Sequence, residues 1–145
     1  MMKSLGLVSR REFLAAAVVA APAFLWTSSS VHRCEHARGP GPHPTPRPGI
    51  DASRVLKESE LKDHPQAVAA FNEVRQIPQV IDGIRCQCGC AKLEGYYSLL
   101  SCYEGDTAMA KMCEVCQGQG RYAFRLHRQG KTLDEIRKAI EERYA

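Results

Sequence analysis

Six of the seven cysteines of this 145-residue chain lie within 31 residues, from Cys86 to Cys116. They occur as Cys86-Gln87-Cys88-Gly89-Cys90, then Cys102, then Cys113-Glu114-Val115-Cys116. Ordinary protein cores contain free cysteines singly, so incidental buried thiols do not explain this density. A domain of about one hundred residues buries a modest core and often needs a disulfide or a metal ion as a staple. The cysteines therefore predict a segment that disulfide bonds or a metal ion hold together.

The first interpretation of these cysteines is a soft-metal site. Alternating cysteines in an extended loop can aim their sulfurs at one centre, and a later pair, one helical turn apart, can face it. Thiolates select Cu(I), Zn²⁺ or iron–sulfur clusters, and one zinc ion takes four ligands. Six sulfurs therefore suit a small Cu(I) cluster or a two-metal site. The candidate ligands are Cys86, Cys88, Cys90, Cys102, Cys113 and Cys116, with Met109 and Met112 as auxiliary candidates.

Two further interpretations use the same thiols. Three disulfides would suit a small exported domain, and strain within the Cys-x-Cys run would direct Cys86, Cys88 and Cys90 to the three later cysteines. Alternatively, Cys113-x-x-Cys116 could exchange disulfides, because a helix N-terminus can lower the pKa of a thiol. No strand-rich, thioredoxin-like pattern surrounds that motif, which counts against the redox alternative.

Residues 1–30 have the layout of an export signal. The stretch Ser9-Arg10-Arg11-Glu12-Phe13-Leu14 leads into an apolar run that ends at Trp26. This run is shorter than the roughly 20 residues that cross a bilayer as a helix. Arg10 and Arg11 resemble the twin-arginine signal, which implies export of a folded protein by the twin-arginine machinery. We therefore expect a periplasmic or other extracytoplasmic protein that folds with reduced thiols and can take up its ion before export.

Residues 31–50 are predicted to form a Pro/Gly-rich linker. Five prolines between Gly39 and Gly49 fix φ and remove amide donors, which favours a semi-extended spacer. The net charge of +4 arises within residues 1–49, and the remainder carries equal numbers of acidic and basic residues. This balance gives no support to a nucleic-acid surface. A weak metal site is a further candidate in the linker, formed by His32, Cys34, His36 and His43.

Residues 51–145 have a predominantly helical pattern. The spacing of apolar residues predicts an amphipathic helix over 65–76, which Pro65 begins and Pro78 stops. Residues 80–83 are expected to turn into the cysteine segment. A second helix is expected from about Thr107, and it would place the sulfurs of Met109, Met112, Cys113 and Cys116 on one face.

The same stripe continues through Gly120 to His127, where Gly118 and Gly120 would permit close packing. Gly130 is predicted to cap this helix, and Thr132 and Glu135 form a capping box for the last one. The spacing of apolar residues in the last helix places Leu133, Ile136, Ile140 and Tyr144 on one side. The predicted fold class is a small, mostly α domain of three to four helices with an irregular Cys-rich loop.

From about His64 to the end, the chain resembles the bacterial PCYCGC-motif proteins, which are exported or lipid-anchored. The matching stretches are Cys86–Cys90, Ser98–Tyr103, Cys113–Cys116 and Gly130–Arg137. The resemblance implies a small helical, metal-binding domain and supplies no activity. Relatives tend to carry Pro or Tyr at the position of Arg85, Tyr at that of Gln87, and His near those of Tyr96 and Met109. A thioether at the last position favours Cu(I) over Zn²⁺.

A shorter likeness, Cys-x-x-Cys-Gln-Gly-Gln from Cys113 to Gln119, is similar to cytochrome c maturation thiol proteins and supports only the redox alternative. Together these features predict a non-enzymatic, extracytoplasmic protein in copper or zinc handling. A delivery partner for its metal ion is expected but not identified.

Overall fold

A computed structural model describes residues 42–144 of the chain. Within this range the α-helices are α1 (Val68–Val74), α2 (Pro78–Asp82), α3 (Glu114–Arg128) and α4 (Leu133–Tyr144). Short 3₁₀ helices lie between them: η2 (Glu58–Glu60), η3 (Pro65–Ala67), η4 (Cys90–Lys92), η5 (Leu100–Tyr103) and η6 (Met109–Lys111). The described part contains no strand, only an isolated bridge between Val55 and Glu104. The predicted mostly α fold of three to four helices is therefore confirmed, with four α-helices in this range.

The predicted export signal, with Arg10 and Arg11, lies outside the described residues. So do His32, Cys34 and His36 of the weak metal site suggested in the linker. These remain predictions. No helix within residues 42–144 combines the length and the apolar character needed to span a membrane.

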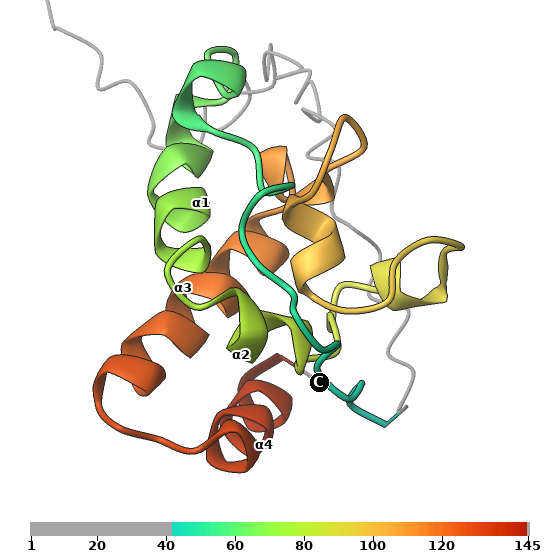
Figure 1. The fold of residues 1–145 in the computed structure, drawn as a ribbon, viewed down its shortest axis with the longest axis vertical. Coiled ribbons are helices and arrows are strands. Elements are labelled where there is room, and N and C mark those ends of the chain that lie inside the picture. The colour runs from blue at the N-terminus through green and yellow to red at the C-terminus, as the bar shows by residue number, and fades with distance from the viewer. Residues whose placement is uncertain (1–41, 145) are drawn as a thin grey trace, which may run out of the picture. The chain divides into compact units, whose positions relative to one another are not determined.

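The helix predicted over 65–76 forms as η3 followed directly by α1. Pro65 occupies the first position of η3, where its missing N–H would have no helical partner in any case. The buried face of α1, formed by Ala70, Phe71 and Val74, packs against α3. In Figure 1 the two helices run beside each other. The sequence pattern thus located this contact helix correctly.

The turn predicted over 80–83 is wrong, because these residues belong largely to α2. Pro78 starts α2 at its first position, and Ile81 and Asp82 are both buried. The same proline that ended the preceding helix therefore begins a new one. Gly83 caps α2, and the chain then enters the cysteine segment.

The hairpin of α3 and α4 follows its local sequence signals. Gly130 lies just after α3 with a φ of 78°, which confirms the predicted cap. In the capping box, the Glu135 N–H donates to Thr132 Oγ1 at 3.3 Å, and the Thr132 N–H donates to Glu135 Oε2 at 2.8 Å. Ile136 and Ile140 are fully buried on the inner face of α4, as their spacing predicted.

The start of α3 differs from the prediction. The helix begins at Glu114 rather than near Thr107, because Ala108 and Cys113 both adopt extended ψ values of 101° and 104°. Between them lies only the 3₁₀ turn η6. The predicted common helical face for Met109, Met112, Cys113 and Cys116 is therefore wrong.

The far end of α3 also departs from its predicted stripe. Val74, at the end of α1, lies against Gly120, so the last turn of α3 extends beyond α1. His127 is consequently exposed, whereas Ala123 is buried.

Gly120 allows the core to close around Tyr103. A Cβ at this position would collide with the Tyr103 hydroxyl and come within 2.7 Å of Val74 Cγ2. Tyr103 is fully buried, and its ring meets that of Phe71 edge-on at 4.8 Å between centroids. The predicted role of Gly120 in close packing is thereby confirmed.

Residues 42–50, from the end of the predicted linker, pack against the helical domain. Arg47 donates from Nη2 to Asp82 Oδ1 at 2.7 Å, and its own N–H donates to Asp82 Oδ2 at 2.8 Å. Backbone carbonyls of Pro44 and Thr45 accept hydrogen bonds from Arg137 and Tyr97. The prolines remove N–H donors but leave these carbonyls available, so side chains of the domain can hold an extended strap.

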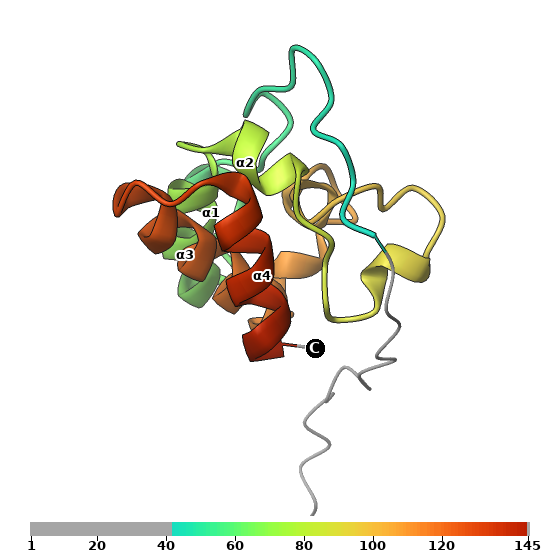
Figure 2. The same ribbon diagram turned by 90° about the horizontal axis from the view of Figure 1, so that it is seen from below.

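The loop that follows Cys90 lies apart from the helices. In both views α1 and α3 lie together, while the yellow loop that follows Cys90 projects away from them (Figure 1). Figure 2 shows α4 on the helical side as well. The longer stretch that contains Cys86, Cys88 and Cys90 is closed at its base by a hydrogen bond from the Leu99 N–H to the Ile84 carbonyl, 2.7 Å long.

Candidate metal centre

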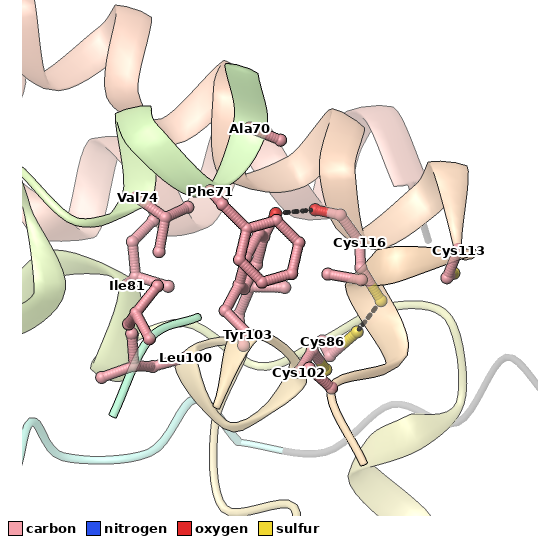
Figure 3. Packing of buried hydrophobic residues seen from close by; sticks show 14 of the residues in the cluster. Ala70, Phe71, Val74, Ile81, Cys86, Leu100, Cys102, Tyr103, Cys113 and Cys116 are labelled. Atoms are coloured by element: carbon pink, nitrogen blue, oxygen red, sulfur yellow. Dashed lines mark hydrogen bonds between the residues drawn. The ribbon is translucent and has the colours of Figure 1, made fainter. Parts of the chain in front are cut away.

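Three separate stretches of the chain bring the six predicted cysteines into one buried cluster. Cys86, Cys88 and Cys90 come from the loop after α2, and Cys102 lies on η5. Cys113 and Cys116 come from the cap and first turn of α3. In Figure 3 the side chains of Cys86, Cys102 and Cys116 point toward one another beside the aromatic core. None of the six residues is more than 5% exposed.

The loop conformation explains how three alternating cysteines reach one centre. Gly89 has a φ of 90°, a left-handed conformation that side-chain-bearing residues rarely adopt. The turn it makes is closed by the Lys92 N–H, which donates to the Gly89 carbonyl at 3.0 Å. Cys88 and Cys90, on either side of this glycine, bring their sulfurs to 2.8 Å. A glycine between the last two cysteines is thus required by the geometry of the loop.

The sulfur atoms are in contact without being joined in pairs. Cys88 Sγ lies 3.1 Å from Cys86 Sγ and 3.3 Å from Cys116 Sγ, and the Cys86 and Cys116 sulfurs are 3.6 Å apart. A disulfide bond is about 2.05 Å long, whereas the sulfurs of a tetrahedral zinc site, with bonds of about 2.3 Å, stand about 3.8 Å apart. These separations, and the 2.8 Å between the Cys88 and Cys90 sulfurs, exceed a disulfide bond and are shorter than those around one tetrahedral ion.

The sulfurs form two overlapping sets. Those of Cys86, Cys90, Cys102 and Cys116 all lie within 4.8 Å of one another. Those of Cys88, Cys113 and Cys116 satisfy the same limit. The first set provides the four ligands that a closed thiolate site uses, and the second provides three. Clustered cysteines in this arrangement could hold a metal ion.

The N-terminus of α3 contributes partial positive charge next to the sulfur atoms. Cys113 caps this 15-residue helix, and Cys116 lies in its first turn. Unpaired N–H groups and the helix dipole place partial positive charge there, which stabilises a thiolate. The cluster therefore has a source of electrostatic stabilisation at the shared sulfur.

The thiols differ in acidity because they hydrogen-bond to one another. Hydrogen bonding with Cys116 holds the pKa of Cys102 well below the ordinary thiol value, and hydrogen bonding with Cys113 lowers that of Cys88. The pKa of Cys116 is raised in turn, because its hydrogen bond to Cys102 favours the neutral thiol. Such a cluster binds protons as a unit, and metal ions would displace those that remain.

The two candidate methionines, Met109 and Met112, differ in their exposure to solvent. Met112 is 72% exposed, so its thioether lies at the surface rather than among the sulfurs. Met109 is partly buried and packs against the core from η6. Both placements follow from the late start of α3, which breaks the helical spacing that related these residues to Cys113 and Cys116.

Two residues that support the cluster were not singled out as site residues. Gln119, on the buried face of α3, accepts a hydrogen bond at Oε1 from the Gln87 N–H at 3.0 Å. Its Nε2 is buried and has no hydrogen-bond partner among residues 42–144. The Tyr103 hydroxyl donates to the Cys116 carbonyl at 2.6 Å (Figure 3). The signal for Gln119 was its spacing, three residues after Cys116, whereas the Tyr103 contact depends on folding.

The base of the cysteine loop is clamped by a buried carboxylate. Asp82, at the end of α2, accepts from the Ser98 hydroxyl at 2.7 Å and from Arg47. Burial alone would raise the pKa of Asp82, but the hydrogen bonds from Arg47 and Ser98 outweigh it and lower the pKa below 3.8. Asp82 and Ser98 lie on opposite sides of the Cys86–Cys90 run, so this contact holds the loop closed.

His43, the one described member of the weak linker site, takes part in other contacts. Its Nδ1 accepts from the Arg85 N–H at 2.9 Å, and its Nε2 lies 3.0 Å from Glu141. Burial lowers the pKa of His43, which favours the neutral ring that can accept this hydrogen bond.

Comparison with known proteins found no matching family model, no similar curated protein and no similar solved structure. The resemblance to PCYCGC-motif proteins stays a prediction.

Proposed function

We propose that this chain is a non-enzymatic, extracytoplasmic protein that binds soft metal ions, copper or zinc, through clustered cysteine thiolates. The observation that carries the proposal is the convergence of six buried sulfurs from three stretches of chain. Thiolate is the ligand type that Cu(I) and Zn²⁺ prefer.

Burial supports a metal ion over a set of bare thiolates. Charged groups removed from water are costly unless a counter-charge or hydrogen bonds compensate. The cluster contains few donors beyond the thiols themselves, whereas a bound cation would neutralise several sulfurs at once. The contacts of 2.8–3.6 Å mean that little movement is needed to bring the sulfurs around an ion.

The proposed location follows from Arg10 and Arg11. Export through the twin-arginine machinery would let the domain fold in the cytoplasm with reduced thiols and acquire its ion there. Replacing both arginines with lysine should retain the protein in the cytoplasm, as fractionation would measure. A delivery partner for the ion remains part of this proposal.

Elemental analysis of protein purified from its native extracytoplasmic fraction tests the metal. We expect copper or zinc in at least equimolar amount, with the six thiols unreactive until a strong chelator is added. Cys34→Ser is the matched control, because it removes the one cysteine outside the 86–116 window and should leave the metal content unchanged.

The same thiol titration separates the competing functions. Metal-free protein with all six cysteines oxidised would identify a disulfide-stapled module and exclude the proposal. Metal-free, reduced protein in which Cys113→Ser or Cys116→Ser traps a mixed disulfide would identify a thiol oxidoreductase instead.

A further inference from the structure

We infer that the cluster holds two adjacent metal ions that share the sulfur of Cys116 as a bridging ligand. This inference rests on the proposed function and specifies how the six thiolates divide. One ion is bound by Cys86, Cys90, Cys102 and Cys116, and the other by Cys88, Cys113 and Cys116.

The division follows from the two sulfur sets. They have Cys116 in common, and every other member belongs to one set. An ion in the first set already has four thiolates, the full number for a tetrahedral site, and uses neither Cys88 nor Cys113. Those two sulfurs, together with Cys116, provide a second site next to the first. Cys88 lies 3.1 Å from Cys86 and 2.8 Å from Cys90, so the two sites are contiguous.

Cys116 is built to be the shared ligand. It is fully buried, it lies in the first turn of α3, and its carbonyl accepts the 2.6 Å hydrogen bond from Tyr103. Its backbone is thus fixed by the helix and by the aromatic core. A sulfur held in this way can contact ions on two sides without rearrangement.

Charge favours two ions over one. A single divalent ion would neutralise two of six buried thiolates, whereas two ions neutralise four, and the N-terminus of α3 offsets part of the remainder. The bridging sulfur also lowers the number of thiolates needed for two sites.

The two ions are not equivalent. The second set has three sulfurs, which leaves one position of a tetrahedral ion for water or an incoming ligand. Its Cys88 and Cys113 are 5% and 2% exposed, and Met112, next to Cys113, is 72% exposed. Cys86 and Cys90 of the first set are 2% and 4% exposed, so the two sites are similarly buried. The three-sulfur ion, with its open ligand position, is therefore the one that exchanges with the surroundings, and the four-sulfur ion is retained.

Cadmium binding to the reduced, metal-free full chain tests this division. We expect two Cd²⁺ ions per chain, and NMR of the spin-active cadmium isotope should give two resonances that split each other through the shared sulfur. A competing chelator should remove one ion quickly and the other slowly. Cys113→Ser should lose the fast-exchanging ion and keep the slow one, and Cys34→Ser should keep both.

The outcomes separate this inference from the proposed function. No cadmium binding by the reduced wild-type chain would overturn both. One ion per chain, or two resonances without mutual splitting, would overturn the shared-sulfur arrangement and leave soft-metal binding intact. The splitting is measured on the wild type, so the test does not depend on any variant folding.

Discussion

The helical hairpin of α3 and α4 and the cysteine segment, residues 84–113, are held together in different ways. The hairpin has a capping box, a glycine cap and fully buried Ile136 and Ile140. The cysteine segment has three short 3₁₀ turns, and five of its buried residues are cysteines. A 3₁₀ turn contributes few and poorly aligned hydrogen bonds, so this segment has less local stability of its own.

This contrast indicates that a bound ion would stabilise mainly the cysteine segment. Cys113 and Cys116 link the cysteine segment to α3, and Tyr103 connects it to the core through the Cys116 carbonyl. We expect the hairpin to fold without metal and the cysteine segment to depend on it.

Removing the metal should have the largest effect. A ligand present at about 1,000 times its Kd stabilises a fold by about 4 kcal/mol, which corresponds to a Tm decrease of roughly 20 °C on its removal. Thermal unfolding before and after chelation measures the decrease. Hydrogen exchange should accelerate in residues 84–113 far more than in 133–144. Restoring the ion is the control, and equal acceleration in both regions would contradict the contrast.

Asp82→Asn should lower the free energy of unfolding by about 2–3 kcal/mol. It breaks a charge pair at the base of the cysteine loop in which the carboxylate is buried and the arginine is only partly buried. The free energy of unfolding of the metal-free protein measures this. Ser98→Ala removes only one hydrogen bond, from a neutral hydroxyl to the same carboxylate, and should cost about 1.5 kcal/mol. Equal decreases in the free energy of unfolding for the two variants would show that the charge pair contributes no more than the hydrogen bond from Ser98.

The same carboxylate predicts a pH dependence. Its pKa is lowered in the folded state, so its stabilising contribution is present above the ordinary value of 3.8 and is lost as pH falls through the lower folded value. Metal-free wild type should therefore lose stability below about pH 4. Denaturant unfolding across that range should give a smaller acid loss for Asp82→Asn than for the wild type.

Gly120→Ala should destabilise the protein by about 1–2 kcal/mol. The overpacking against Tyr103 and Val74 outweighs the gain of roughly 1 kcal/mol in helix propensity. Gly118→Ala is the matched control, because its Cβ would meet only the tip of the Tyr144 side chain at 2.9 Å, which can move. We expect the control to change stability by less than about 1 kcal/mol. Denaturant unfolding compares them, and a larger loss at Gly118 would be inconsistent with this packing.

Met112→Leu should have the smallest effect. Because its side chain is exposed, metal stoichiometry should stay unchanged and stability should change by less than about 0.5 kcal/mol. Cadmium titration and thermal unfolding measure the two quantities. Loss of an ion in this variant would show that the thioether reaches the cluster after all.

The elements that could be predicted from the sequence alone are those whose signals come from nearby residues. The capping box of Thr132 and Glu135, the cap at Gly130 and the inner face of α4 depend on residues within a few positions of one another. Such interactions are the same wherever the segment lies, so spacing and residue type were sufficient. The density of cysteines likewise predicted that their sulfurs share one centre.

The arrangement of the sulfurs within that centre could be seen only in the tertiary structure. The extended backbone of Cys113, the exposure of Met112 and the shared position of Cys116 were not evident from the spacing of these residues. The clamp of Arg47, Asp82 and Ser98 results from contacts between residues far apart in the chain, and no periodicity in the sequence relates its members. Helical spacing predicts neighbours only while the helix continues, and here it is interrupted just where the cysteine segment meets α3.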